Sequence, residues 1–269
     1  MSKNTKAEYN RAKLILKPLF MPFSRLVTYM GKENRIDSGP NLIIANHPGF
    51  GRDIAGIVNG FDRQLHVMAA HYLFDRKVFI KDHIEPALGP ILYKLLYPIA
   101  RSFAGYFTSK MNRLEMIPIN KDYHGDKKEL SDNLRKAIDI VKDYLLRGKA
   151  VVMFQIPLDM LKTMGRKTAS FKIKSEYNDY LPKFNPTVGK IIYELYQDHE
   201  ITVPVTPISI HGAEGINPFK RMTLNIGPAL NIVSSLENQT GKSPVTEFTN
   251  SLEKRVAELL EESLAARNR

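Results

Sequence analysis

The sequence predicts an α/β fold with a mainly parallel central sheet flanked by helices. From Asn41 onward, short apolar runs of β type alternate with segments of helical periodicity, a pattern typical of parallel sheets covered by helices. The run AVVMFQI, Ala150–Ile156, is apolar at nearly every position and therefore needs cover on both faces. Because no internal repeat is visible, we predict one domain, residues 32–269, behind an N-terminal segment, residues 1–31.

The N-terminal segment, residues 1–31, is predicted to be a basic amphipathic helix. It carries six basic residues and one acidic residue, Glu8, with apolar residues between them, and Pro18 and Pro22 would bend it. Such a helix is typical of a segment that lies in a membrane interface; the alternative is a helix that packs on its own domain. No secretory signal or uninterrupted apolar run of about 18 residues is visible, so we expect a peripheral or monotopic protein at the cytoplasmic face of a membrane.

The elements of the predicted domain follow from local patterns. The first strand, NLIIAN (Asn41–Asn46), runs into a polar turn and the helical stretch DIAGIVNGF, residues 53–61. The later predicted elements are a strand at Met116–Asn120, a helix at Lys127–Arg147, a strand at Ala150–Ile156, a helix at Pro186–Tyr196, strands at Ile201–Ile210 and Met222–Gly227, and a helix at Val245–Ala266. Strands and helices thus alternate along the chain.

Residues 86–107 form a long apolar insertion after the first of these strands. Aromatic and aliphatic residues there are mixed with Lys94 and Arg101. This mixture suits a membrane interface where acyl chains enter; a pair of core helices is the alternative.

Composition limits the classes of function. The formal net charge of +11 favours polyanionic partners such as phospholipid headgroups or nucleic acid. The chain has no cysteine, which excludes disulfides, thiolate nucleophiles and zinc sites built on sulfur. No nucleic-acid-binding motif is visible, and the histidines lack ligand spacing such as His-x3-His. We therefore expect neither nucleic acid nor a metal.

The segment NHPGFGRD, residues 46–53, is the strongest chemical signal. It lies where a strand ends and a helix begins, the place where α/β sheets present reactive groups. His47 can accept a proton near neutral pH, and Asp53 can hold the other ring nitrogen and stabilise the imidazolium. The alternative is a loop histidine followed by an aspartate that caps the next helix.

This segment resembles the hallmark of the glycerol-phosphate and lysophosphatidate acyltransferase family, an Asn-His motif followed by Asp after four residues. Here five residues separate His47 from Asp53. MIPINK, Met116–Lys121, resembles the second block of the family, whose basic residue contacts the acceptor phosphate; here it is Lys121, where arginine is usual. A plain surface charge is the alternative for this lysine.

Further blocks follow in the family's order. Phe154–Asp159 stands where the family reads Phe-Pro-Glu-Gly-Thr-Arg, without the glutamate and arginine, and Arg166 is a candidate for the missing positive charge. FNPTVGKIIYEL, Phe184–Leu195, is similar to a further family segment. Val203–Ile208 is close to the family's Val-Pro-Val strand, for which a buried structural strand is the simpler interpretation.

The resemblance implies an O-acyltransferase of phospholipid metabolism. It would move a fatty acyl group from acyl-CoA or acyl carrier protein to a hydroxyl of a glycerophospholipid precursor or other lipid acceptor, with His47 as general base, Asp53 as its partner and no further cofactor. The implied substrate-binding residues are Asn46, Gly49, Gly51, Arg52, Lys121, Gln155 and Arg166, with main-chain N–H groups near the two glycines facing the oxyanion. Membrane lipids, the acyl donor and acyl carrier protein are the expected partners. A non-catalytic lipid-binding protein of the same fold is the alternative.

Overall fold

The computed structural model describes residues 26–48, 52–70, 74–113, 115–119, 127–155, 181, 184–213, 221–237 and 243–267. The chain divides into two compact units. The larger unit comprises Leu16–Leu65 and Val141–Arg269, and the smaller one comprises Met1–Ile15 and His66–Ile140. These divisions differ from the predicted boundary after residue 31.

The sheet of the larger unit confirms the predicted mainly parallel arrangement. Its strands lie in the order β1 (Val27–Met30), β7 (Met222–Ile226), β6 (Val205–His211), β2 (Asn41–Asn46) and β5 (Ala150–Gln155). The central strand β2 is parallel to both β5 and β6, and β1 is parallel to β7. Only the β6–β7 pair among these is antiparallel.

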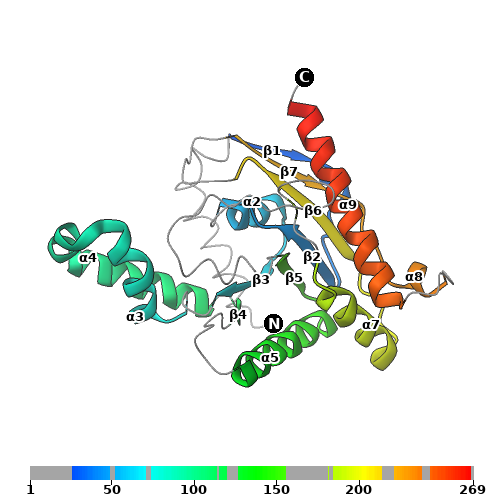
Figure 1. Cartoon of the computed structure of the whole chain (residues 1–269), viewed down its shortest axis with the longest axis horizontal. Helices are drawn as coiled ribbons and strands as arrows, with labels where there is room; N and C mark the ends of the chain where they lie inside the picture. The colour runs from blue at the N-terminus through cyan, green and yellow to red at the C-terminus, as the bar shows by residue number, and fades with distance from the viewer. Residues whose placement is uncertain are drawn as a thin grey trace. The chain divides into compact units, whose positions relative to one another are not determined.

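Helices cover both faces of this sheet (Figure 1). They are α2 (Arg52–Gly60), α7 (Thr187–His199), α8 (Val233–Glu237), α9 (Pro244–Arg267) and the last residues of α5 (Lys127–Leu146). Along β7, Leu224 faces α2, where a Cβ on Gly56 would lie 2.8 Å from its side chain. The next residue, Asn225, points to the opposite face of the sheet and donates a hydrogen bond to the main chain of α9. Both faces of the sheet are therefore covered, which is why a central strand such as β5 can be apolar at nearly every position.

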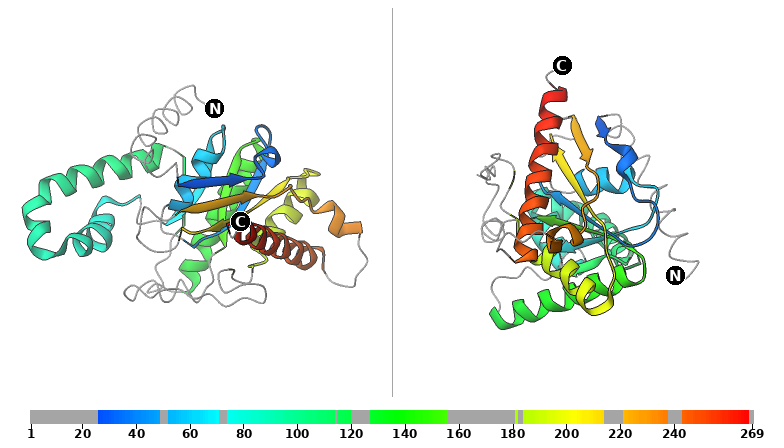
Figure 2. Two further views of the ribbon diagram at one scale, coloured as in Figure 1. Left: turned by 90° about the horizontal axis from the view of Figure 1, so that it is seen from above. Right: turned by 90° about the vertical axis from the view of Figure 1, so that its right-hand side faces the viewer.

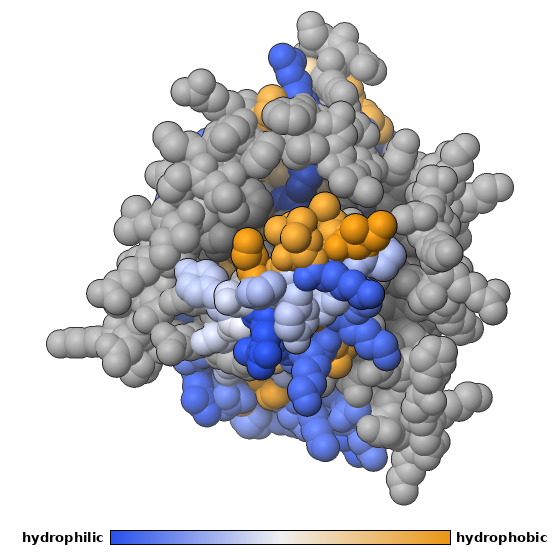
Figure 3. Space-filling view, turned by 90° about the vertical axis from the view of Figure 1, so that its left-hand side faces the viewer, coloured by the Kyte–Doolittle hydropathy of each residue, from blue (hydrophilic) through white to orange (hydrophobic). Residues whose placement is uncertain are grey.

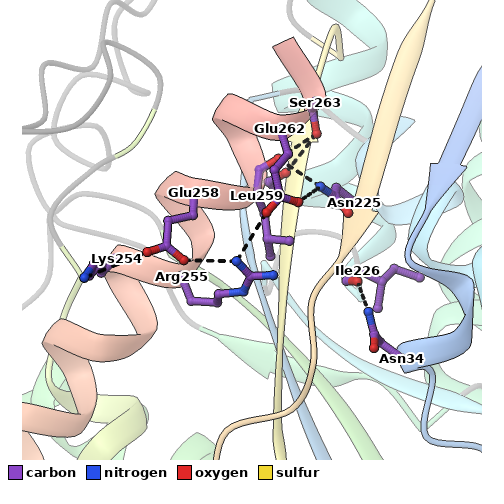
Figure 4. A network of polar contacts seen from close by, with 10 residues as sticks. Asn34, Asn225, Ile226, Lys254, Arg255, Glu258, Leu259, Glu262 and Ser263 are labelled. Atoms are coloured by element: carbon purple, nitrogen blue, oxygen red, sulfur yellow. Dashed lines mark hydrogen bonds and ion pairs between the residues drawn. The ribbon is translucent and has the colours of Figure 1, made fainter. Parts of the chain in front are cut away.

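Polar bonds fix α9 against β6 and β7, beside which it runs in Figures 2 and 4. Buried Asn225 donates from Nδ2 to the carbonyl of Leu259 at 3.1 Å and to Glu262 at 2.9 Å. Ser263 donates to the same carbonyl at 2.8 Å, and its hydroxyl lies 3.3 Å from that of Ser209 on β6. Directional bonds of this kind set the register of a helix that apolar packing alone would leave free to slide.

The end of the predicted N-terminal helix is a strand in the structure. Residues 1–25 lie outside the described residues, but Val27–Met30 form β1, paired with β7. The prediction of a helix through residue 31 is therefore wrong for these residues. A β-branched and aromatic run, Val27 to Tyr29, favours a strand where a sheet edge is present to pair with it.

Tyr29 ties β1 to α2, and its removal is expected to destabilise the larger unit. Its hydroxyl donates to the carbonyl of Gly56 at 2.9 Å, and burial raises the pKa of Tyr29 from 10.0 to about 12. The folded protein prefers the neutral phenol. The stability that the neutral Tyr29 contributes is therefore complete at pH values below its unfolded pKa of 10.0, and it is lost as the pH rises toward the folded pKa of about 12. Tyr29→Phe should lower the free energy of unfolding by about 1 kcal/mol at neutral pH.

Urea unfolding of both proteins at about pH 8 and about pH 11 checks this expectation. The wild-type protein should lose more stability between the two pH values than Tyr29→Phe, because only the wild type has this phenol to ionise. Equal alkaline losses would contradict the assignment of the shift to Tyr29.

The smaller unit contains a parallel strand pair and a helical hairpin. β3 (Leu65–Ala70), where no strand was predicted, pairs with β4 (Ile117–Ile119). Between them lie α3 (Arg76–Phe79), a π-helical turn at Ile80–Ile84 and α4 (Glu85–Arg113). Residues 86–107, for which a membrane interface and a pair of core helices were the two alternatives, lie within α4. None of the helices in the described ranges is both long enough and apolar enough to cross a bilayer.

α4 is interrupted at Gly89, and the helical segment doubles back on itself (Figure 2). Gly89 has φ 70° and ψ 165°, a conformation that is accessible to glycine because it has no Cβ. Pro90 then starts the returning stretch, where a missing N–H costs nothing. Further along, Gly105 lies against the guanidinium of Arg76, so the two arms of the hairpin pack on each other.

Candidate active site

Three strands of the larger unit end at the same edge of the sheet. β2 pairs in parallel register with β5, which places Asn46 beside Gln155, and with β6 on its other side. His47 follows β2 directly. The edge formed by the carboxyl ends of parallel strands is where α/β folds hold reactive side chains.

His47 and Asp53 are in contact at this edge. Nδ1 of His47 bonds Oδ2 of Asp53, whose side chain is fully buried in the first turn of α2. The other carboxylate oxygen accepts a hydrogen bond from the N–H of Ile54 at 2.9 Å. Partial positive charge at a helix N-terminus favours a carboxylate there. The five intervening residues therefore still allow the expected contact.

Phe154 fixes the imidazole from a second direction. Its ring centroid lies 4.5 Å from that of His47, with 30° between the ring planes. The His47 side chain is 15% exposed. With Nδ1 held by Asp53 and one ring face against Phe154, Nε2 is the nitrogen left to exchange a proton with a substrate. We did not predict Phe154 as a site residue, since its place beside His47 follows only from the pairing of β2 with β5.

Asn46, which was predicted to contact substrate, bonds the neighbouring strand β6 through its side chain. Its side chain is fully buried. Nδ2 donates to the carbonyl of Ile210 at 2.9 Å, and Oδ1 accepts from the N–H of Ile210 at 2.7 Å. Both ends of the amide are therefore bonded to the main chain of β6, which makes Asn46 a positioning residue immediately before His47.

Gln155 and Arg52 support neighbouring segments. Gln155 is buried, and its Oε1 accepts from the N–H of Asn185 at 3.1 Å. Glu253, also buried, accepts from the N–H of Phe184 at 2.7 Å, so the two side chains together hold the entry to α7. Arg52 is half-buried at the start of α2, with Nη1 3.5 Å from the carbonyl of Gly212. Gln155 thus has a structural partner where we predicted a substrate contact.

The remaining predicted positions divide into two groups. Gly49, Gly51, Lys121 and Arg166 lie outside the described residues, as do residues 156–159 of the third block. The fourth block is buried: Val203 immediately before β6 and Val205 and Ile208 within it are fully enclosed, which favours a structural role. Within the described ranges, no group of three or more histidine, aspartate or glutamate side chains could hold a metal ion.

Comparison with known proteins supports the architecture. No family model matches the chain, and neither does any curated protein sequence. Among solved structures, the chain is similar to the crystal structure of the 1-acyl-sn-glycerophosphate (LPA) acyltransferase PlsC from Thermotoga maritima. The TM-score is 0.51 at 18% identity, over 97% of this chain and 84% of that chain. The chain therefore has the α/β fold of that protein over nearly its whole length.

Proposed function

We propose that this chain is an O-acyltransferase, with His47 as the general base and Asp53 as the carboxylate that orients it. The observation that carries the proposal is the bond between His47 Nδ1 and a fully buried aspartate. It lies at the carboxyl edge of a sheet whose fold is that of a known lysophosphatidate acyltransferase. A buried carboxylate on Nδ1 selects the tautomer in which Nε2 accepts a proton.

In the proposed reaction, the acceptor hydroxyl attacks the carbonyl carbon of an acyl thioester. Its proton moves to Nε2 of His47 while the new C–O bond forms, a transfer worth roughly 10²–10⁴ in rate. When the tetrahedral intermediate collapses, the C–S bond breaks, and the departing thiolate takes the proton back from the imidazolium. The products are an ester and a free thiol. Asp53 stabilises the imidazolium between the two steps.

The proposed substrates follow from charge and from the resemblance to lysophosphatidate acyltransferases. The donor is acyl-CoA or acyl carrier protein, and the acceptor is a glycerophospholipid precursor or a related lipid at the cytoplasmic face of a membrane. A net charge of +11 suits a phosphate-bearing acceptor and an anionic membrane surface. In this proposal Lys121 and Arg166 supply positive charge to the acceptor.

Acceptor-dependent release of free thiol from acyl-CoA or acyl carrier protein tests the proposal. The wild-type chain should release thiol and form ester when lysophosphatidate or glycerol phosphate is supplied. Asp53→Asn should lower this rate by at least about tenfold, because an amide N–H facing Nδ1 favours the tautomer whose Nε2 cannot accept a proton. The exposed Asp198 on α7 provides the matched control, Asp198→Asn, which should retain the wild-type rate.

Two results would count against the proposal. Full activity of Asp53→Asn would remove Asp53 from the mechanism. If no donor and acceptor pair gives ester above the rate without protein, while the chain still binds lipid, the alternative of a non-catalytic lipid-binding protein would stand.

A further inference from the structure

Exposed apolar side chains gather on α4. Six of the eight large apolar side chains exposed among the described residues lie on this helix. They are Ile91, Leu92, Leu95, Tyr97, Ile99 and Tyr106. Ile91 is 85% exposed, Leu95 75% and Ile99 67%. Single exposed leucines are ordinary in a folded protein, but a group of them on one element marks a contact surface.

Three of these side chains form a stripe opposite the packed side of α4. Ile91, Leu95 and Ile99 are spaced by four residues, which places them on one side of the helix. Ala100, Ala104 and Thr108 have the same spacing on another side and are buried. The hairpin therefore already has its own internal packing face, and the exposed stripe is a second apolar face that its fold does not use.

Positive charge borders the stripe. Lys94 and Arg101 are exposed and seven residues apart, so they share a side of α4 next to the apolar stripe. Lys77 and Lys81 are also exposed on the other arm. In sequence, residues 76–113 hold seven Lys and Arg side chains against two Asp and Glu side chains. Figure 3 shows, on the face that it draws, a group of hydrophobic residues bordered by hydrophilic ones.

The positive charge and the apolar side chains together indicate which partner binds this surface. A second copy of the chain would bring the same basic hairpin, and like charges around the contact would repel. An anionic bilayer offers both kinds of contact that this surface needs. Its headgroup phosphates can bind Lys94 and Arg101, and its acyl boundary can bury the aliphatic stripe. Tyr97 and Tyr106 have the aromatic and hydroxyl character that favours the headgroup level.

We propose that α4 docks on the surface of an anionic bilayer, with Ile91, Leu95 and Ile99 entering the acyl boundary and Lys94 and Arg101 at the headgroup phosphates. The docking rests on the proposed function for its purpose, delivery of a lipid acceptor, and on the exposed face of α4 for its location. It assigns the membrane contact to an internal hairpin in addition to the basic segment at residues 1–31.

Flotation of the full chain with vesicles tests the docking without any need for catalysis. The chain should float with vesicles of phosphatidylcholine and phosphatidylglycerol. Ile91→Glu/Leu95→Glu/Ile99→Glu should weaken the partition by at least roughly 100-fold, because three aliphatic burials are lost and three charges oppose insertion. Leu134→Glu/Leu146→Glu, at two exposed leucines of α5, is the matched control and should float like the wild type. Lys94→Gln/Arg101→Gln should weaken binding to these vesicles more than binding to phosphatidylcholine alone.

A fluorescence reporter keeps the test independent of how well the triple variant folds. The chain contains no tryptophan, so Leu95→Trp introduces a single indole on the stripe, and Leu134→Trp is its control. On adding vesicles with brominated acyl chains, the emission of the Leu95→Trp protein should shift to the blue and be quenched. The emission of the Leu134→Trp protein should not change.

Several results would overturn the docking. They are wild-type flotation by the triple variant, absence of vesicle binding by the wild type, and unquenched emission from Leu95→Trp. A dimer that the triple variant dissociates, with vesicle binding retained, would identify a second copy as the occupant. Vesicle binding without thiol release would leave the docking intact and refute the proposed function, so the two proposals fail separately.

Discussion

His47→Ala is expected to lower acyl transfer by roughly 10²–10⁴-fold, the range that a positioned general base contributes. Alanine removes the ring that the fully buried Asp53 orients at this edge of the larger unit's sheet. The fold should persist, because the His47 side chain lies at the end of β2 and none of the sheet's main-chain bonds depends on it. The loss should appear in kcat more than in KM, since the base acts in the transition state.

The measurement is steady-state thiol release at saturating and limiting donor, with circular dichroism as the check on folding. His199, exposed at the end of α7, allows a matched control: His199→Ala should keep the wild-type kcat. A His47→Ala protein that is folded and fully active would end the proposed mechanism, whatever the function of the chain.

Asn46→Leu should cost the larger unit about 2–6 kcal/mol of unfolding free energy. Leucine has nearly the shape of asparagine but cannot bond, so the buried N–H and carbonyl of Ile210 each lose a partner. Each unsatisfied buried group costs about 1–3 kcal/mol. The same change removes the anchor of the residue before His47, so acyl transfer should fall even at temperatures where the variant stays folded.

Urea unfolding monitored by far-UV circular dichroism measures this loss. Asn250, exposed on α9, provides the control, because Asn250→Leu should change the unfolding free energy by no more than about 0.5 kcal/mol. If Asn46→Leu were as stable as the control, the two bonds to Ile210 would contribute nothing to the stability of the larger unit.

Most helices and strands could be predicted because periodicity is a local property. The helix predicted at Lys127–Arg147 is α5, Lys127–Leu146, and the strand predicted at Ala150–Ile156 is β5, Ala150–Gln155. β1 was missed because its four residues end a basic segment whose pattern favours a helix. β3 was missed because its run, LHVMAA, includes the polar His66. In both cases pairing with another strand outweighs local preference.

The amino-acid sequence alone determined that His47 follows a strand and that Asp53 lies in the first turn of a helix, because one short segment encodes both. Only the tertiary structure decided what surrounds this pair: Phe154 against the imidazole, and Ile210, 164 residues from Asn46, bonded to its amide. It also decided that one face of α4 is buried and another apolar face is exposed. The reason is physical, since periodicity records which side of an element is apolar, and long-range packing selects what each side meets.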